Sequence, residues 1–295
     1  MSEGKRVAII GVFDGVHRGH QAVIAQARAL AGAGKVIALT FDPHPLAVLA
    51  PESVPDMLMT IDDRVEALKS AGADSVVIVP FTEELSRQTP REFIEEFVVG
   101  RAGADAVVVG TNFRFGRGAS GDIQTLRELG RDLGFDVRPL ELRGDGGRFS
   151  STRVRKALAE GDLSAAVEVL GYPFAYRGVV VHGDHRGRTL GVPTANVVVP
   201  QGRAAPADGV YAGFVARADG TRLPSAISVG DNPQYAGTER RIEAHVVDRS
   251  DLDLYGEEIA VGFLRRLRGQ EVFDTEEEFI AQMQRDIDQA RTSLP

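Results

Sequence analysis

The chain has 295 residues, enough for about two domains with cores of their own. It carries 34 Lys and Arg against 42 Asp and Glu, and a net charge of −8 argues against nucleic acid or an anionic membrane as a partner. The lack of Cys excludes disulfides and Cys-based metal sites. No apolar run is long enough to cross a bilayer, and the first strand is too short for a signal peptide, so we expect a cytoplasmic protein.

Short β-branched runs alternate with amphipathic stretches up to about Glu160. Apolar residues repeat at helical spacing over Ile61–Ala71 and again over Phe93–Val98. This alternation predicts a mostly parallel sheet with helices on both faces, which binds ligands at the carboxyl ends of its strands. The expected strands are Val7–Ile10, Val36–Phe41, Ser75–Val79, Ala106–Val109 and Phe135–Leu140.

The sequence GVFDGVHRGH, Gly11–His20, directly follows the first expected strand. A helix that begins there offers unpaired N–H groups and the positive end of its dipole, and glycines let an anion approach the main chain. His17 and His20 can add two imidazole donors to the same group. The motif therefore predicts a phosphate site. Half of a metal site and plain surface polarity are the alternatives, although no third ligand is near in sequence.

Two further motifs favour an anion site. FDPHP, Phe41–Pro45, ends the second strand with a rigid turn that can aim Asp42 and His44 at the same sheet edge. FSSTRVRKAL, Phe149–Leu158, places hydroxyl side chains at a helix start, with cations directly after them. A capped helix with a solvated basic face is the alternative for this second motif. The histidines favour an anion site. In addition, cations in the first turn oppose the helix dipole, and a bound anion would compensate for them.

The glycines of FGRGASGD, Gly116, Gly118 and Gly121, match the G-x-G-x-x-G pattern of dinucleotide-binding proteins. An NAD-dependent oxidoreductase is therefore an alternative. However, the pattern follows the fourth expected strand rather than the first, and no clear acidic residue ends a following strand to bind the ribose. We expect a flexible substrate loop here.

After about Gly171, short strands follow one another without helices until the end of the chain. This pattern predicts a small antiparallel barrel or sandwich, closed by a helix over Thr275–Ala290 with Asp274 as its N-cap. Gly, Pro and aromatic residues over Leu170–Gly178 mark the join, so we expect domains of residues 1–171 and 172–295. The expected strands are Gly178–Val181, Asn196–Val199, Val210–Ala216, Ala226–Val229, Ile242–Val247 and Ile259–Leu264.

Motifs of both halves, in order, resemble those of the bacterial bifunctional riboflavin kinase/FAD synthetase family. GVFDGVHRGH, FDPHP, GTNFRFG and SSTRVR are similar to its adenylyltransferase half. GDHRGRTLGVPTAN, PADGVY, RIEAHV and DLYG are similar to its kinase barrel. The resemblance implies a Rossmann-like nucleotidyltransferase domain followed by a small antiparallel β-barrel. It also implies two reactions: riboflavin and ATP give FMN and ADP, and FMN and ATP give FAD and pyrophosphate.

The resemblance further implies small-molecule partners, namely ATP, riboflavin, FMN and FAD, with Mg²⁺ as cofactor. A transient homo-oligomer is left open. In the first domain, His17, His20 and Arg153 would be catalytic, because they would neutralise charge on the triphosphate while the FMN phosphate attacks its α-phosphorus. The residues expected to bind nucleotide or flavin there are Gly11, Phe13, Asp14, Asn112, Ser151, Thr152 and Arg155.

In the second domain, Thr194 and Asn196 are two residues apart, so on a strand they would face the same side and offer oxygen ligands to Mg²⁺. Glu243 matches the family's glutamate that accepts the proton of the attacking riboflavin hydroxyl. An outward-facing glutamate on a barrel strand is the alternative. The glycine-rich loop is expected to close over the nucleotide, and a plain hairpin is its alternative. Its expected binding residues are Gly183, Arg186, Gly187, Arg188 and Gly191.

Two positions depart from the family pattern. Phe149 stands where the family usually has Ile, an apolar exchange of little cost. Gln234 stands where it usually has Thr, which puts flavin affinity in question. Three other functions stay open: an adenylyltransferase whose barrel only binds flavin, a flavin-binding regulator without turnover, and a first domain that acts on another acceptor, such as phosphopantetheine or glycerol phosphate.

Overall fold

The computed structural model describes residues 4–141, 143–144, 147–183, 192–230, 240–249 and 251–293. The chain divides into two compact units, Met1–Ser151 and Thr152–Pro295. This division falls at the start of helix α7 (Ser151–Glu160), whereas the motifs place the domain boundary at Gly171. Each unit contains a sheet and a core of its own, as the fold class expected from the sequence requires.

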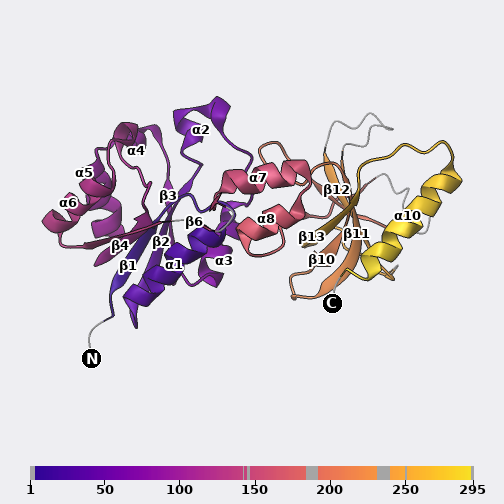
Figure 1. Ribbon diagram of the computed structural model, residues 1–295, viewed down its shortest axis with the longest axis horizontal. Coiled ribbons are helices and arrows are strands. Elements are labelled where there is room, and N and C mark those ends of the chain that lie inside the picture. The colour runs from indigo at the N-terminus through magenta and orange to yellow at the C-terminus, as the bar shows by residue number, and fades with distance from the viewer. Residues whose placement is uncertain are drawn as a thin grey trace. The chain divides into compact units, whose positions relative to one another are not determined.

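Five parallel strands, accompanied by helices (Figure 1), form the sheet of the first unit. Their order is β3-β2-β1-β4-β5. Every strand expected from the sequence is confirmed to within one residue at each end. The buried runs of β-branched and other apolar residues explain this agreement, because central parallel strands are covered on both faces. The strands are β1 (Arg6–Ile10), β2 (Lys35–Asp42), β3 (Ser75–Pro80), β4 (Ala106–Gly110) and β5 (Asp136–Leu140).

Helices cover both faces of this sheet. Val7 and Ile9 of β1 belong to the core under α1 (Arg18–Ala31) and α3 (Ile61–Ser70). Ala8 and Ile10 face the opposite core, to which α5, η2 and α6 contribute. The helix expected around Phe93 is present, but its turns from Ile94 onward are π-helical. The remaining elements are α2 (Leu46–Leu49), η1 (Pro51–Ser53), α4 (Glu83–Arg87), α5 (Pro90–Phe93), η2 (Ile94–Arg101), η3 (Arg117–Ala119), α6 (Ile123–Leu133), β6 (Arg143–Gly144) and β7 (Gly147–Arg148).

Strand β1 lies at the centre of the sheet, where the chain changes direction. From β1 the chain passes through α1 to β2 on one side, and it later returns to β4 on the other side. The connections that follow β1 and β4 therefore diverge at the carboxyl edge of the sheet, which is where open parallel sheets bind ligands. The segment of residues 11–17, hereafter the β1–α1 loop, lies at this point.

The second unit contains a six-stranded antiparallel sheet in the order β8-β13-β10-β11-β12-β9. Its edge strands meet: the Val181 N–H donates to the Asn196 carbonyl, and a side chain at Gly178 would collide with Val197, so the sheet is a nearly closed barrel. Tyr176, Tyr211 and Phe263 fill its interior. The strands are β8 (Ala175–Val179), β9 (Ala195–Val198), β10 (Gly209–Ala216), β11 (Arg222–Gly230), β12 (Arg241–Val246) and β13 (Glu258–Arg268).

Three strand boundaries expected from the sequence are wrong: β11 begins four residues before Ala226, β13 ends four residues after Leu264, and the start of β8 also differs. Strand β8 begins at Ala175, three residues before Gly178, within the segment taken as the join. Gly171 and Pro173 indicate a linker there, but Phe174 and Tyr176 alternate with exposed neighbours and are buried. Two helices precede this strand, α7 and α8 (Leu163–Leu170).

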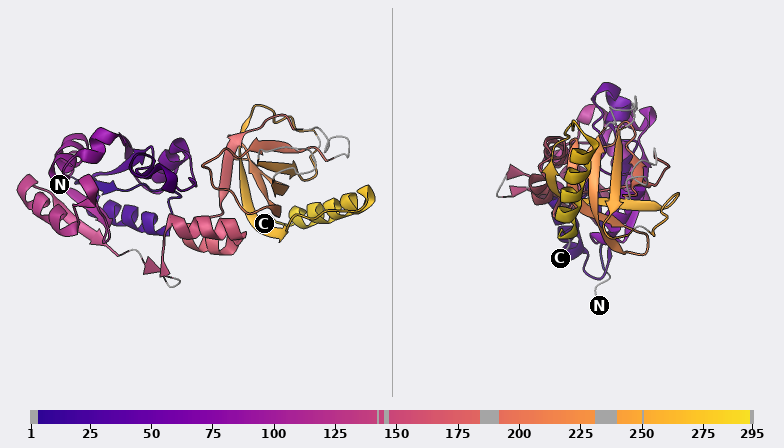
Figure 2. Two further views of the ribbon diagram at one scale, coloured as in Figure 1. Left: turned by 90° about the horizontal axis from the view of Figure 1, so that it is seen from above. Right: turned by 90° about the vertical axis from the view of Figure 1, so that its right-hand side faces the viewer.

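Helix α10 (Glu276–Arg291) packs beside β10 and β11 (Figure 2). Its N-cap is Thr275 rather than Asp274, because the helix starts one residue later than expected and the Thr275 hydroxyl accepts the Glu278 N–H at 3.2 Å. Ile287 and Ala290 are buried against the sheet. Farther back along the helix, Phe279 is 39 % exposed.

A buried ion pair fastens the end of this helix. Two guanidinium nitrogens of Arg268 donate to Asp286, at 2.8 and 3.0 Å, and the side chains are only 15 % and 4 % exposed. Removal of Asp286 leaves the buried Arg268 guanidinium with only the half-exposed carboxylate of Glu271, 3.9 Å away.

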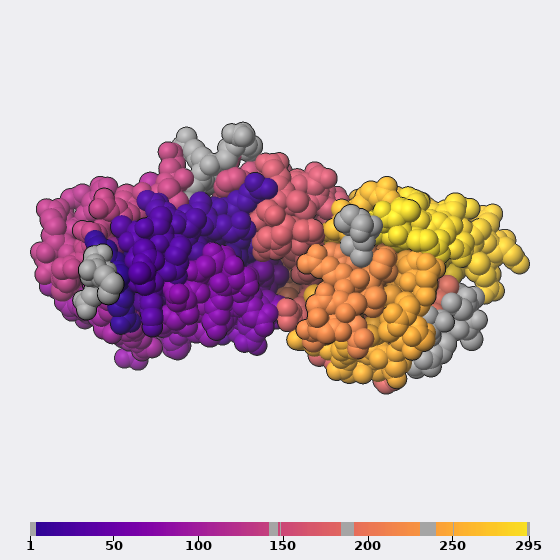
Figure 3. Space-filling view, turned by 90° about the horizontal axis from the view of Figure 1, so that it is seen from below, coloured from indigo at the N-terminus to yellow at the C-terminus, as the bar shows by residue number. Residues whose placement is uncertain are grey.

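Each unit presents a contiguous packed surface in the space-filling view, indigo to magenta for the first and orange to yellow for the sheet and last helix of the second (Figure 3). None of the helices in the described ranges combines the length and apolar character that crossing a bilayer requires.

We expect Asp286→Asn to lower the free energy of unfolding by about 3 kcal/mol, because it removes the buried carboxylate that pairs with Arg268. Asp288→Asn is the matched control on the same helix: Asp288 pairs with Arg291, both are about half exposed, and its loss should cost less than about 1 kcal/mol. Urea denaturation followed by circular dichroism measures both. Equal effects would contradict a structural role for the buried pair.

Candidate active sites

The β1–α1 loop is held in an unusual backbone conformation. Phe13 and Val16 have positive φ angles of 55° and 32°, which side-chain-bearing residues rarely adopt, and Gly15 between them has φ 79°. Both side chains are 2 % exposed and belong to the core beneath α1. Their burial therefore stabilises a strained loop, a combination common where a backbone must present functional groups.

Asp14 connects this loop to two distant segments. Its carboxylate is 2 % exposed and accepts the backbone N–H groups of Leu58, at 3.0 Å, and Met59, at 3.1 Å. Its backbone carbonyl accepts the Ser151 hydroxyl at 2.7 Å. A buried carboxylate requires such donors. Asp14 and Ser151, both expected to bind nucleotide or flavin, thus fix the loop from opposite directions.

The two histidines lie against each other at the start of α1. Their rings stack with centroids 3.6 Å apart, and the rings of Phe13 and His20 form a T-shaped contact with centroids 5.1 Å apart. His17 caps the helix: its Nδ1 accepts the His20 N–H at 3.4 Å, so the ring hydrogen of neutral His17 is assigned to Nε2. The Nδ1 of His20 is buried with no hydrogen-bond partner in the described structure.

Burial holds the pKa of His20 well below its ordinary value, and the nearby charges of His17 and Arg64 lower it further. Two stacked imidazolium rings would repel each other, which also disfavours protonation of His20. Within the described residues, no group of three or more His, Cys, Asp or Glu side chains is placed to hold a metal ion.

Gly19 permits the stacking. A Cβ there would lie 3.1 Å from the His17 ring and 3.2 Å from the Cβ of Phe149, tighter than ordinary contact. The glycine between the histidines therefore has a packing function besides the approach to the main chain that its motif suggests.

The other predicted residues of this site have different surroundings. Gly11 continues the sheet, since its N–H donates to Leu39, and Asn112 is exposed in the turn after β4, at the same edge of the sheet. Arg153 lies 3.4 Å from Glu168 within the second compact unit. Thr152 and Arg155 also belong to that unit, so the position of these three residues relative to the histidines stays a prediction.

The motifs FDPHP and FGRGASGD both have local functions in the fold. The His44 ring nitrogen Nδ1 accepts the Leu46 N–H at 3.1 Å, which stabilises the turn of FDPHP. After the glycine-rich segment, Asp122 caps α6 by accepting the Thr125 N–H at 2.9 Å. A carboxylate thus occupies the helix end that a dinucleotide phosphate would need, and this argues against the NAD alternative.

Sequence reasoning missed Arg64. This residue of α3 is 2 % exposed, and its guanidinium donates to the Phe41 carbonyl at the end of β2. A charged residue at a buried helix position was the available signal, but nothing in the motif indicates which loop it faces.

In the second unit, strand register brings together the predicted kinase residues. Asn196 of β9 lies directly opposite Glu243 of β12, which lies opposite Ser228 of β11, so their side chains share one face of the sheet. Asn196 Nδ2 contacts the Thr194 hydroxyl and carbonyl, each at 3.3 Å. We call Thr194, Asn196, Glu243 and Ser228 the polar row.

Two further residues border the polar row. Gly183 lies against the Asn196 amide, where a Cβ would come within 2.8 Å of its oxygen. The Gln270 amide donates to the Ser228 hydroxyl at 3.3 Å, a contact without a signal in the sequence motifs. The expected residues Arg186, Gly187, Arg188 and Gly191, as well as Gln234, lie outside the described residues.

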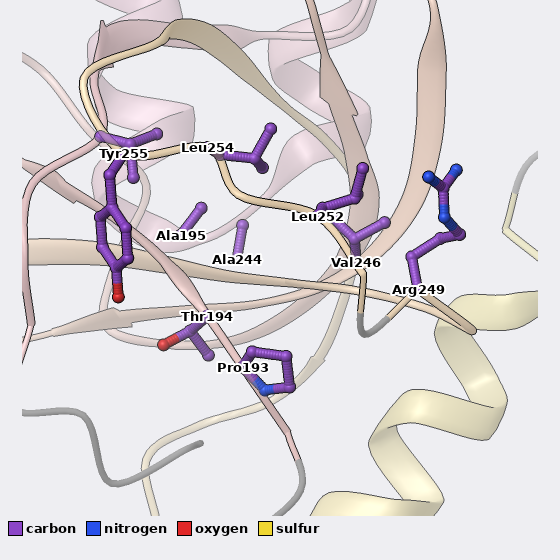
Figure 4. A pocket seen from close by; sticks show the side chains of 10 residues that line it. Pro193, Thr194, Ala195, Ala244, Val246, Arg249, Leu252, Leu254 and Tyr255 are labelled. Carbon is purple, nitrogen blue, oxygen red and sulfur yellow. The ribbon is translucent and has the colours of Figure 1, made fainter.

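A pocket lies on the opposite face of these strands, with Thr194 at its edge. Tyr255 and Arg249 lie at opposite ends of it (Figure 4). The Tyr255 ring also contacts the His182 ring at a tilt of 30°, with centroids 4.1 Å apart. The lining residues are Val180, Pro193, Thr194, Ala195, Ala244, Val246, Arg249, Leu252, Leu254 and Tyr255.

A parallel sheet with a histidine pair at its switch point, followed along the chain by a nearly closed barrel with a polar row, is consistent with a two-part transferase. The family model described as FAD synthetase matches residues 1–153, and the one described as riboflavin kinase matches residues 170–294. The chain therefore belongs to the bifunctional riboflavin kinase/FMN adenylyltransferase family, which confirms the resemblance drawn from its motifs.

Curated relatives with that name match almost the whole chain. The protein of Escherichia coli K12 is 38 % identical over 95 % of this chain and 90 % of its own length. That of Listeria monocytogenes is 34 % identical, over 97 % of this chain and 91 % of its own length. A crystal structure described as a macrolide-efflux protein from Streptococcus pneumoniae is 30 % identical and covers 99 % of this chain and 95 % of its own, with a TM-score of 0.87.

We expect a bound triphosphate to raise the pKa of His20, because an adjacent anion favours imidazolium. At pH values between the lowered pKa of His20 in the free protein and its raised pKa in the complex, binding takes up a proton, so affinity falls as pH rises. Calorimetry with a non-hydrolysable ATP analogue, in buffers of different ionisation enthalpy between about pH 5 and about pH 7, measures this uptake. The same uptake in His20→Ala would refute the assignment.

Proposed function

We propose that the chain makes FAD from riboflavin in two ATP-dependent steps, riboflavin phosphorylation in the second unit and FMN adenylylation in the first. The observation that carries this proposal is that both candidate sites retain the family's chemical groups, the histidine pair on the β1–α1 loop and Glu243 beside Asn196 on paired strands. A cytoplasmic enzyme with small-molecule partners fits the acidic composition.

In the adenylylation step, an FMN phosphate oxygen attacks the α-phosphorus of ATP, the bond to the bridging oxygen breaks, and pyrophosphate leaves. No covalent enzyme intermediate is needed. The rings of His17 and His20 are positioned by the rigid loop to donate to phosphate oxygens as charge shifts toward the leaving group. The proposal extends along α7 to Thr152, Arg153 and Arg155, and to Asn112 for orienting flavin or nucleotide.

In the kinase step, a ribityl hydroxyl of riboflavin attacks the γ-phosphorus of ATP, and ADP leaves. Glu243 accepts the hydroxyl proton. The donor set beside it fits Mg²⁺: an amide oxygen on Asn196 of β9 and a hydroxyl on Thr194, directly before that strand, are both hard ligands. When bound with ATP, Mg²⁺ supplies charge neutralisation at the phosphates. Because Asn196 Nδ2 points to Thr194, its oxygen points elsewhere and can accept a ligand.

The pocket across the strand from the polar row suits the adenine of ATP. Its walls are mostly apolar, the flat ring of Tyr255 lies at one end, and Thr194 belongs both to the pocket and to the polar row. A nucleotide with its base there could extend its phosphates past Thr194 toward Asn196.

A time course with riboflavin, ATP and Mg²⁺, resolved by flavin chromatography, tests the proposed function. We expect FMN to appear first and then to be replaced by FAD. FMN alone would confine catalysis to the barrel. FAD formed only from supplied FMN would leave an adenylyltransferase with an inactive barrel, and no conversion at all would favour the flavin-binding regulator.

We expect His20→Ala to reduce FAD formation from FMN by about 100-fold or more, because it removes a positioned donor to the phosphates. Riboflavin phosphorylation should stay within about twofold, since that site lies on other elements. Both rates are measured on the same purified protein, so the kinase rate reports correct folding. Loss of both rates in a folded protein would overturn the model of two independent sites.

Glu243→Gln is expected to have the reverse effect, with riboflavin phosphorylation slowed by about 100-fold and FMN adenylylation retained, because an amide cannot accept the hydroxyl proton. Glu258→Gln on β13 is the matched control: its partly exposed side chain lies 3.7 Å from Arg177, away from the polar row. A kinase rate in Glu243→Gln as high as in the control would exclude Glu243 as the base.

A further inference from the structure

Arg64 is a buried cation of the first unit, and few polar groups compensate for the burial of its charge. It lies in the second turn of α3, whose start is fixed by a reciprocal capping pair of Thr60 and Asp63. The residue is 2 % exposed, and its Nε is buried without a hydrogen-bond partner. No carboxylate lies within ion-pair distance of it in the described part of the chain. An apolar side chain of similar length would fill this position at lower cost.

The polar contacts of Arg64 lead to the β1–α1 loop. One guanidinium nitrogen donates to the Phe41 carbonyl at 2.9 Å and lies 3.4 Å from the Thr40 hydroxyl. That hydroxyl donates to the Val12 carbonyl at 3.0 Å. The chain Arg64–Thr40–Val12 therefore supports the loop from the side of β2.

The backbone just before α3 supports the same loop through Asp14. Leu58 and Met59 donate their N–H groups to its carboxylate. The α3 segment thus holds the loop at two places, through Asp14 and through Arg64. Asp14 and Asp42 are the acidic groups whose charge acts on Arg64, but burial outweighs them and lowers the pKa of Arg64.

Arg64 is also close enough to act on the histidine pair, where its charge, together with that of His17, disfavours protonation of His20. A buried positive charge near a ring that donates to phosphate strengthens the attraction for an anion. The same charge disfavours protonation of the ring in the free protein.

We propose that Arg64 is a positioning residue of the adenylylation site. It holds the β1–α1 loop in place and supplies a buried positive charge that bound polyphosphate neutralises. The proposal rests on FMN adenylylation as the function of the first unit. Its test therefore includes a measurement that does not depend on turnover.

The test compares Arg64→Met and Arg64→Lys with the matched control Lys69→Met, which removes a charge from the exposed side of the same helix. In Arg64→Met we expect kcat/KM for FMN adenylylation to fall about 30-fold, with riboflavin phosphorylation within about twofold. Arg64→Lys should recover part of this loss, since it restores the charge but not the geometry. Lys69→Met should match the unaltered chain.

Two readouts separate positioning from mere stability. The pKa of His20, followed by NMR of its ring, should rise in Arg64→Met and stay low in Arg64→Lys. Affinity for inorganic tripolyphosphate, by calorimetry, should fall about tenfold in Arg64→Met. If Arg64→Met does not fold, Arg64→Gln replaces it in the same comparison.

Unchanged tripolyphosphate affinity and an unchanged pKa of His20 in the folded neutral variant would overturn the proposal. Equal loss of both enzymatic rates in Arg64→Met and Arg64→Lys would do so as well, because it would mean general destabilisation. An unaltered chain that forms no FAD would refute the proposed function of this unit, while the affinity and the pKa of His20 would still decide the role of Arg64.

Discussion

The buried carboxylate of Asp14 is the interaction on which the first site depends. Parallel-sheet geometry brings the β1–α1 loop to the switch point, but geometry alone does not fix a loop that contains Phe13 and Val16 at positive φ. Asp14 joins it to Leu58, Met59 and Ser151, three positions far away in sequence. The loop that carries the imidazole pair is thus held by the segment before α3 and by the start of α7, which gives the rigidity that charge stabilisation in phosphoryl chemistry requires.

The second site is organised by strand register instead. Asn196, Glu243 and Ser228 come from three strands and share a face because antiparallel pairing places them opposite one another. A slip of one residue would turn Glu243 into the barrel and Ile242 out of it. The buried Ile242 and Ala244 exclude that slip, so the hydrophobic core of the barrel also sets the position of the proposed base.

Much of this was accessible from sequence, because the strands of the first sheet are continuous apolar runs and the histidine motif is local. Alternation of apolar and polar residues indicates which face Asn196 and Glu243 occupy, but not that these two residues pair across strands. Arg64 and the partners of Asp14 were not accessible, since their contacts join segments separated by many residues and leave no periodic signal. The start of β8 was hidden by Gly171 and Pro173, and the choice between Asp274 and Thr275 as N-cap depends on one residue of helix length.

The fastening of α10 is uneven along its length. Asp286, Ile287 and Ala290 are buried near its end, whereas Phe279 and Ile280 near its start are 39 % and 42 % exposed. Local opening of a helix costs least where few contacts must be broken. Backbone amide hydrogens should therefore exchange with solvent faster in the first two turns than in the last two, so that the helix frays from one end while the other stays attached to the barrel.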